Sequence, residues 1–168
     1  MALETPPASV QSDGKWRITY VPTGSNAKSV AILNGATAKP LTYGLTADGW
    51  AYSKTQATVE DKRLTMIADL SRPGRTTESW EVKCIESTVA DSADAILAGL
   101  ATSGANAQIL VRRGIDNATT HVVAQVADLH TVVVGTRRPQ APVENGVDTV
   151  AYTLYPVLPS ENGIALIA

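Results

Sequence analysis

The sequence predicts a mainly β fold, an antiparallel β-sandwich or open barrel with one flanking α-helix at about residues 91–103. Three observations predict it. Apolar and polar residues alternate over several short runs, turn dipeptides separate these runs, and one segment has the period of an amphipathic helix. A chain of this kind buries one face of its strands and uses the helix to cover part of the core.

The strands are predicted from their period of two, which places one side of each strand in the core and the other in water. The alternating runs are 15–20, 80–84 and 149–154. Apolar runs predict further strands at 29–33, 63–70, 107–113, 121–135 and 163–168. Turn dipeptides begin at Asp13, Asn34, Asp48, Pro73, Asn145 and Asn162, each followed by glycine.

The helix is predicted from its capping residues and its apolar stripe. Asp91 stands where an N-cap residue belongs, and Asp94 follows three residues later as in a capping box. Gly104 supplies the left-handed residue that ends a helix. The stripe consists of Ala93, Ile96, Leu97, Leu100 and Ala101. We therefore expect a short helix packed against an apolar sheet face.

The chain is long enough for one well-buried domain, which we expect to span residues 13–168. Residues 1–12 contain two prolines and few apolar side chains, so they predict an N-terminal arm. Two long polar stretches, 34–62 and 137–146, are interpreted as loops. Because long loops in compact domains are commonly functional, these two are candidates for contacts with partners.

Composition excludes several classes of protein. The formal net charge of −2 argues against a basic nucleic-acid binder, and no apolar run is long enough to span a bilayer. The first residues show no basic segment followed by an apolar one, so we expect no secretory signal. Cys84 is the single cysteine, which excludes an internal disulfide and fits a reducing compartment.

The residue pattern shows no catalytic signature, and we expect no enzyme, no cofactor and no metal. The segment 22–29, PTGSNAKS, lacks the glycine before lysine that a phosphate-binding loop requires. The two histidines, His121 and His130, have no cysteine or acidic cluster at ligand spacing. The acidic pairs 60–61 and 81/86 could form a hydrolase dyad, but the chain has only eight aromatic residues to build a sugar groove.

Three segments have a recognisable order: GLTADGWAYSKTQATVEDKRLTMIADLSRPGR at 44–75, DSADAILAGLATSG with ILVRRGID at 91–116, and VVVGTRRPQAPVENGVDTVAYTLYPVLPSENGIALIA at 132–168. In this order they resemble the major tail tube protein of long-tailed, non-contractile bacteriophages, especially those that infect actinobacteria. Together they cover roughly residues 44–168, and the first forty residues are less similar.

The resemblance implies a structural virion protein that forms stacked homohexameric rings, the tube through which the genome passes during ejection. The implied partners are copies of the same chain, other tail proteins such as the tape measure and the terminator, and double-stranded DNA in non-specific passage; a membrane is not among them. The implied location is the virion tail, with assembly in the host cytoplasm.

Two groups of residues are candidate sites under this interpretation. Aromatic and charged residues of the loops are candidates for subunit contacts: Trp50, Tyr52, Glu60, Asp61, Arg137, Arg138 and Glu144. Polar strand positions are candidates for the channel lining: Lys15, Arg17, Thr19, Thr149 and Thr153. The aromatic residues could equally cap their own domain.

Two other functions remain open at this point. One is a tail terminator or completion ring of related fold. The other is a carbohydrate-binding β-sandwich, against which the missing secretion signal and the few aromatic residues count.

Overall fold

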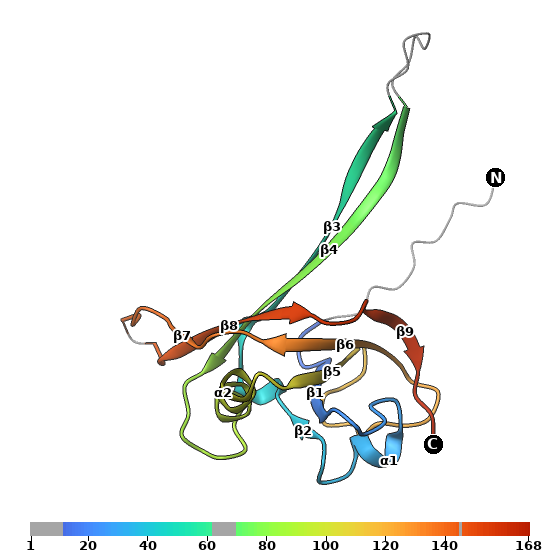
Figure 1. Cartoon of the computed structure of the whole chain (residues 1–168). Coiled ribbons are helices and arrows are strands. Elements are labelled where there is room, and N and C mark those ends of the chain that lie inside the picture. Colours follow the sequence, from blue (N-terminus) through green and yellow to red (C-terminus); the bar gives the residue numbers. More distant parts are fainter. Residues whose placement is uncertain (1–11, 62–69, 145) are drawn as a thin grey trace, which may run out of the picture. The chain divides into compact units, whose positions relative to one another are not determined.

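The computed structural model describes residues 12–61, 70–144 and 146–168. Within these ranges no helix is long and apolar enough to cross a membrane. The elements in chain order are β1 Trp16–Pro22, α1 Val30–Leu33, β2 Lys39–Pro40, the 3₁₀ turn η1 Thr42–Gly44, β3 Leu45–Asp61, β4 Leu70–Ile85, α2 Ala93–Ser103, β5 Asn106–Arg113, β6 Val126–Val134, β7 Arg138–Pro139, β8 Thr149–Pro156 and β9 Glu161–Ala165 (Figure 1).

The described residues group into two compact units. Unit 1 comprises the described residues within Met1–Tyr43, Asn106–Thr131 and Leu158–Ala168, and unit 2 comprises those within Gly44–Ala105 and Val132–Val157. Strand β6 contributes its first residues to unit 1 and its last residues to unit 2.

Unit 1 is an antiparallel sheet with the strand order β2-β1-β5-β6, and β9 pairs with the first half of β6. Strand β1 pairs with β5 along its whole length, from Trp16 opposite Arg113 to Pro22 opposite Ala107. A buried apolar cluster holds the unit together; it consists of Val21, Ala27, Leu33, Ala38, Leu110, Ala127, Leu129 and Leu166.

The prediction of a strand at 29–33 is wrong, because residues 30–33 form the short helix α1. A continuous apolar run has no period that separates a strand from a buried helical turn. Here tertiary contacts decide: Leu33 is buried in the unit 1 cluster, and Val30 and Ile32 pack against it. The Val30 N–H also donates a hydrogen bond to the Ile167 carbonyl at 2.8 Å, which ties the helix to the last residues of the chain.

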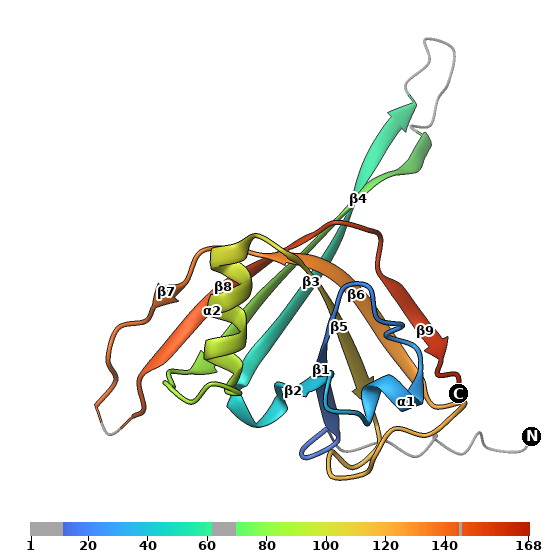
Figure 2. The same ribbon diagram turned by 60° about the horizontal axis from the view of Figure 1, so that its bottom comes forward.

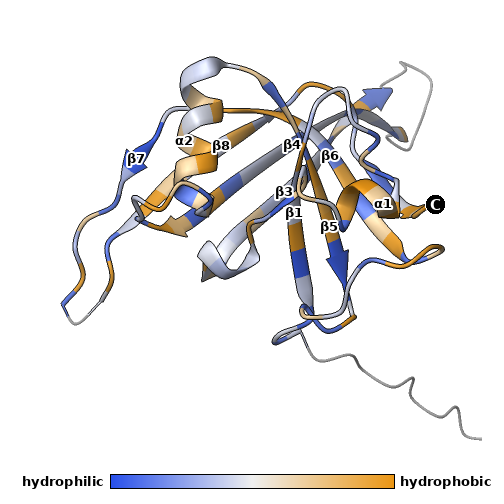
Figure 3. Ribbon diagram, turned by 90° about the horizontal axis from the view of Figure 1, so that it is seen from below, coloured by the Kyte–Doolittle hydropathy of each residue, from blue (hydrophilic) through white to orange (hydrophobic). Residues whose placement is uncertain are grey.

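Unit 2 is an antiparallel sheet in which the end of β6 is followed by β8, β4 and β3, with β7 added to β8. The predicted alternation is confirmed on β4 and β8. Trp80, Val82 and Cys84 are buried. In β8, part of which is hydrophobic in Figure 3, Val150, Tyr152 and Leu154 are buried in the same way.

Helix α2 covers the buried face of the unit 2 sheet and contacts β4. Its N-cap is Ser92, one residue later than predicted, and the Ser92 hydroxyl accepts a hydrogen bond from the Ala95 N–H at 3.2 Å. Gly104 ends the helix with φ of 63°, as the sequence predicted. Ala93, Leu97 and Leu100 of the predicted stripe are buried.

Strands β3 and β4 form a long hairpin, and the prediction of a loop over residues 34–62 is therefore wrong. The segment contains β2, η1 and the 17-residue strand β3. Residues 51–60 are exposed throughout, so neither side of this strand faces a core. A strand without a buried face carries no apolar alternation, and this is why its sequence resembles that of a loop.

The fold class is confirmed: the described chain is mainly β, antiparallel and not closed into a barrel, with β2 ending the strand order in unit 1 and β3 ending it in unit 2. The predicted strand at 63–70 falls almost entirely on residues outside the described ranges. The strand predicted at 121–135 is shorter and begins at Val126.

Candidate interaction surfaces

The far half of the β3–β4 hairpin, here called the arm, is the largest exposed element of unit 2. It comprises residues 54–61 and 70–78, paired from Lys54 opposite Glu78 to Asp61 opposite Leu70. Strand β8 runs beside β4 only from Trp80 to Ile85, so no third strand accompanies the arm in the described chain. Figures 1 and 2 show the arm extending beyond the other elements of unit 2.

Cross-strand pairs hold the two strands of the arm together. The Lys54 ammonium lies 2.7 Å from a Glu78 carboxylate oxygen, and the Arg72 guanidinium lies 3.4 Å from Asp61. The Arg72–Asp61 pair lies at the surface, where ion pairs contribute little to stability, whereas the Glu78 side chain is only 9% exposed. An isolated two-stranded ribbon is nevertheless marginally stable in water. The arm therefore gains from any partner that covers one of its faces or adds a strand to its edge.

The side of the unit 2 sheet opposite the buried residues forms a second surface, here called the polar face. Its members alternate in sequence with the buried residues of β4 and β8 or stand opposite them in register: Ala51, Ser53, Thr77, Ser79, Glu81, Lys83, Ile85, Thr149, Ala151, Thr153 and Tyr155. Five of these are serine or threonine. An open hollow of about 310 Å³ lies over part of this face, lined on β3 and β4 by Ala51, Ser53, Ser79 and Glu81, among other residues.

Two ion pairs lie on the polar face. The Arg138 guanidinium reaches over from β7 and donates to Glu81 at 3.2 Å and to the Thr153 hydroxyl at 2.8 Å. The Lys83 ammonium donates to Asp48 at 2.8 Å, and this hydrogen bond raises the pKa of Lys83 and lowers that of Asp48. Arg138 and Lys83 thus each have an anion beside them.

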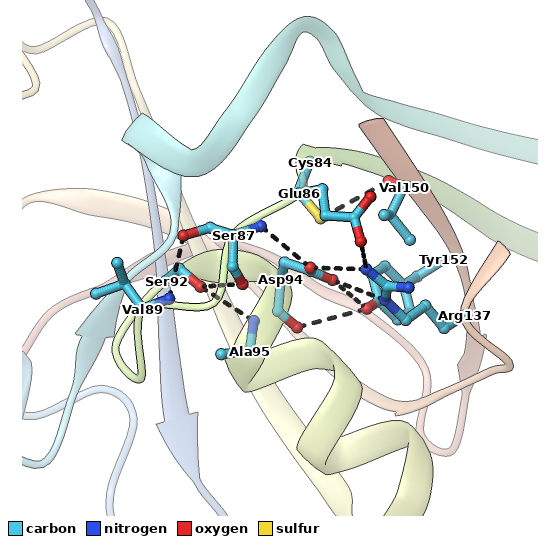
Figure 4. A network of polar contacts seen from close by, with 10 residues as sticks. All are labelled: Cys84, Glu86, Ser87, Val89, Ser92, Asp94, Ala95, Arg137, Val150 and Tyr152. Atoms are coloured by element: carbon cyan, nitrogen blue, oxygen red, sulfur yellow. Dashed lines mark hydrogen bonds and ion pairs between the residues drawn. The ribbon is translucent and has the colours of Figure 1, made fainter. Parts of the chain in front are cut away.

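A buried polar network, drawn in Figure 4, joins several elements of unit 2, and the part of the unit that it joins is here called the base. Asp94 of α2 is 4% exposed; it accepts hydrogen bonds from the Arg137 guanidinium at 3.0 and 3.2 Å and from the Tyr152 hydroxyl at 2.6 Å. Arg137 also donates to Glu86 at 2.8 Å. The network therefore joins α2, the segment after β4, the segment after β6, and β8.

The network sets the titration of its members. Burial alone would raise the pKa of Asp94, but the hydrogen bonds from Arg137 and Tyr152 outweigh burial and lower it. Burial, reinforced by the hydrogen bond to Asp94, raises the pKa of Tyr152. Burial raises the pKa of the Cys84 thiol to about 11, so this cysteine is an unreactive thiol at neutral pH.

Unit 1 contains a cluster of two arginines and one histidine: the half-buried Arg17 and the buried Arg112 and His121. Arg112, with no exposed area, donates to the carbonyls of Asp116, Thr119 and Thr120 and to the Gln125 side chain. Arg17 donates to the carbonyls of Asn117 and Thr119, so the two arginines together fix the loop after β5. His121 is 1% exposed, and burial together with both arginines lowers its pKa to about 4.

The predicted contact residues fall into two groups. Glu60 is exposed on the arm, Asp61 is half-buried near its far end, and Glu144 is exposed on the segment between β7 and β8. The others interact within unit 2: Tyr52 stacks on Trp80 with ring centroids 5.2 Å apart, Arg137 joins the Asp94 network, and Arg138 pairs with Glu81. Trp50 is half-buried opposite Val82.

The predicted lining residues are divided between the units. Thr149 and Thr153 lie on the polar face of unit 2 and are half-buried. Thr19 of unit 1 is only 1% exposed and contacts His121, so it offers no surface to a channel. Arg17 is used to bind the loop carbonyls, and Lys15 is half-buried at the start of β1.

The sequence missed the roles of Asp94, Arg112 and His121. Asp94 was interpreted as a helix-capping residue and is the centre of the buried network instead. Its position three residues before Leu97 on the apolar side of the helix was a usable signal, because a carboxylate on a core-facing stripe requires a buried cation. In the part of the chain that the structure describes, no group of three or more His, Cys, Asp or Glu residues could hold a metal.

Unit 2 is thus an open antiparallel sheet, and its last strand β3 has an edge that pairs with no further strand of the described chain. Such an edge is a place where another chain can pair. The sequence matches the phage tail tube protein family over residues 3–167, and the chain belongs to this family. No curated protein matches it. Among solved structures, it is similar to a chain of the 6-fold symmetrised cryo-EM baseplate of the anti-feeding prophage (TM-score 0.61, 8% identity, 95% of this chain and 96% of the other). At this identity the likeness concerns the fold alone.

The family identifies the chain as a structural phage tail protein and therefore as a component of the virion. It also suggests a non-enzymatic role.

Proposed function

We propose that this chain forms stacked hexameric rings of a phage tail tube that conducts the genome during ejection. The observation that carries the proposal is the arm together with the open β3 edge: 17 residues of strand whose outer side pairs with no strand of the described chain. Exposed edges of this length promote association with other chains, and a ring of identical copies removes them.

The size of the channel supports a sheet that is built from strands of several copies. Strands lie about 4.8 Å apart, so a closed barrel of about eight strands is roughly 16 Å across and filled with side chains. Six copies that contribute about four strands each would give about 24 strands and a backbone diameter of roughly 45–50 Å. A barrel of that size admits a DNA duplex, whereas one copy cannot surround it.

The polar face of unit 2 is our candidate for the channel lining. Its small hydroxylated side chains and paired charges give a wet surface without excess positive charge, and a duplex passing over it would find few attachment points. The opposite face carries the buried residues and α2, so it is unavailable for lining. Thr149 and Thr153 keep the role that the sequence suggested, and Ser53, Ser79 and Ala51 are added to them.

The arm residues Glu60 and Asp61, together with Glu144, are our candidates for contacts between copies. Residues 1–12, of which the structure describes only Ser12, are proposed to contribute to ring stacking. A variant without these residues should remain folded and lose stacking. Tape measure, terminator and double-stranded DNA are the further partners that this function requires, and host cytoplasm is the proposed place of assembly.

The decisive experiment uses a variant in which the arm, residues 54–78, is replaced by a two-residue Asn-Gly turn joining Ser53 to Ser79. This variant should remain folded, because the buried residues of unit 2 lie outside the arm. It should form no tubes, while the unaltered chain forms open-ended tubes in negative-stain images. Tubes of normal length from the armless variant would refute the proposal.

The alternative as a terminator or completion ring predicts a different particle. Purified protein would then form single closed rings that do not stack at high concentration. Light scattering separates the two outcomes, because the mass of a tube grows with concentration whereas that of a closed ring is constant.

A further inference from the structure

We infer that the two ion pairs of the polar face mask its cations from DNA, with Glu81 and Asp48 acting as the residues that keep the channel surface non-adhesive. This inference rests on the proposed function, since it assumes that the polar face lines the channel. It assigns a role to two carboxylates that neither stability nor the family match explains.

The first masked cation is Arg138. Its guanidinium is bound by the Glu81 carboxylate at 3.2 Å and the Thr153 hydroxyl at 2.8 Å, and its side chain is 49% exposed. An arginine exposed to this degree is able to bind a phosphate, because its planar fork of donors matches phosphate oxygens. Glu81, 50% exposed, occupies one donor and cancels the charge.

The second masked cation is Lys83. Its ammonium lies 2.8 Å from Asp48, whose other oxygen accepts a hydrogen bond from the Thr46 hydroxyl at 2.8 Å. Thr46 thus holds Asp48 in place. Gly49, next to Asp48, brings the β3 backbone close to the Lys83 carbonyl, since a Cβ atom at this position would lie 2.4 Å from that oxygen. The irregularity in β3 between Leu45 and Trp50 therefore brings Asp48 within reach of Lys83.

Both pairs are too exposed to stabilise the fold substantially, so their arrangement calls for another explanation. A paired cation and anion produce a dipolar field that weakens faster with distance than the field of a single charge. Binding of DNA by cations gains free energy from the release of counterions, and the gain scales with the number of phosphates neutralised. Removal of the two carboxylates would expose Arg138 and Lys83 in every copy around each ring and turn a passive surface into a binding one.

The test compares DNA retention by assembled tubes of the unaltered chain and of E81Q, D48N and the double variant. Tubes are confirmed by negative-stain imaging, incubated with a short fluorescent duplex and sedimented. At about 50 mM salt the double variant should retain at least about tenfold more duplex than the unaltered tubes, and most of it should be released at about 200 mM salt.

The matched control is E161Q. Glu161 pairs with Lys28 at 2.6 Å in unit 1, so this variant makes the same change of charge as either single variant and frees a cation outside the polar face. It should retain no more DNA than the unaltered tubes. A second variant, S79K, adds an unpaired cation to the polar face with both native pairs intact, and it should retain DNA even if loss of Glu81 or Asp48 impairs folding.

The outcomes separate the two proposals. If the unaltered chain forms no tubes, the proposed function fails and this inference fails with it. If tubes form and neither the single variants nor the double variant retain more DNA than E161Q, the tube function stands and the masking role is overturned. If S79K also retains no more DNA, the polar face does not line the channel.

Discussion

Acidification should destabilise unit 1 through a single histidine. His121 is 1% exposed, its side chain lies against Thr19, and Arg17 and Arg112 repel the charged form of its ring. Its pKa in the folded chain is about 4, against an ordinary value of 6.5. His121 therefore binds a proton less readily in the folded state than in the unfolded state.

The sign of the effect follows from this depression. Between pH 6.5 and pH 4 the unfolded chain binds more protons at His121 than the folded chain does, so stability decreases as the pH falls through this window. The difference of about 2.5 pKa units corresponds to about 3 kcal/mol once both states are protonated. About 2 kcal/mol of this should already be lost between pH 7 and pH 5, where few carboxylates titrate.

Urea unfolding at a series of pH values measures the free energy of unfolding, and NMR titration of the imidazole gives its pKa directly. The variant H121Q should lose most of the pH dependence between pH 7 and pH 5. The variant H130Q, which removes the other histidine, should retain it. An His121 resonance that titrates near 6.5 in the folded chain would falsify this reasoning, as would equal slopes for the two variants.

Two further predictions concern unit 2. D94N should lower the free energy of unfolding by about 2–4 kcal/mol, because it removes the negative charge that pairs with Arg137. The control E144Q, on an exposed carboxylate of the same unit, should change the free energy of unfolding by less than about 0.5 kcal/mol. Equal urea midpoints for the two variants would contradict the stabilising role of the network. G49A should cost about 1–3 kcal/mol, since its Cβ would meet the Lys83 carbonyl at 2.4 Å and the Thr46 backbone at 2.7 Å. G99A in α2 has nothing within 4 Å of the new Cβ and should instead stabilise by about 0.5–1 kcal/mol in thermal unfolding.

The sequence predicted those elements whose side chains face two different environments. Strands β4 and β8 have one buried and one wet side, and α2 has an apolar stripe between recognisable caps, so period and capping identified them. Strand β3 was missed because its exposed half has the same environment on both sides. Helix α1 was missed because four consecutive apolar residues have no period at all.

The buried polar residues could not be predicted for a different reason. Asp94 and Arg137 are 43 residues apart, and Arg17 lies 100 residues from the Asn117 carbonyl that it binds. Local pattern carries no information on such pairs, because their proximity is a product of strand order. The contact candidates Arg137 and Arg138 show the consequence: arginines that appeared available for a partner are used inside unit 2.

The buried network and the arm have different roles in unit 2: the network stabilises the subunit, and the arm is our candidate for assembly. The base holds a buried carboxylate that is bound by an arginine and a tyrosine. A buried network in which some hydrogen bonds are missing is unfavourable, so the base favours one fixed geometry. The described part of the arm has no buried side of its own, and under the proposed function contacts with other copies supply most of its stabilisation. Substitutions in the network should therefore change the unfolding of the isolated subunit, whereas substitutions in the arm should leave that unfolding nearly unchanged and alter assembly. If arm variants lower the free energy of unfolding of the isolated subunit as much as D94N does, the arm is part of the folded core. The argument for association through the arm would then fail.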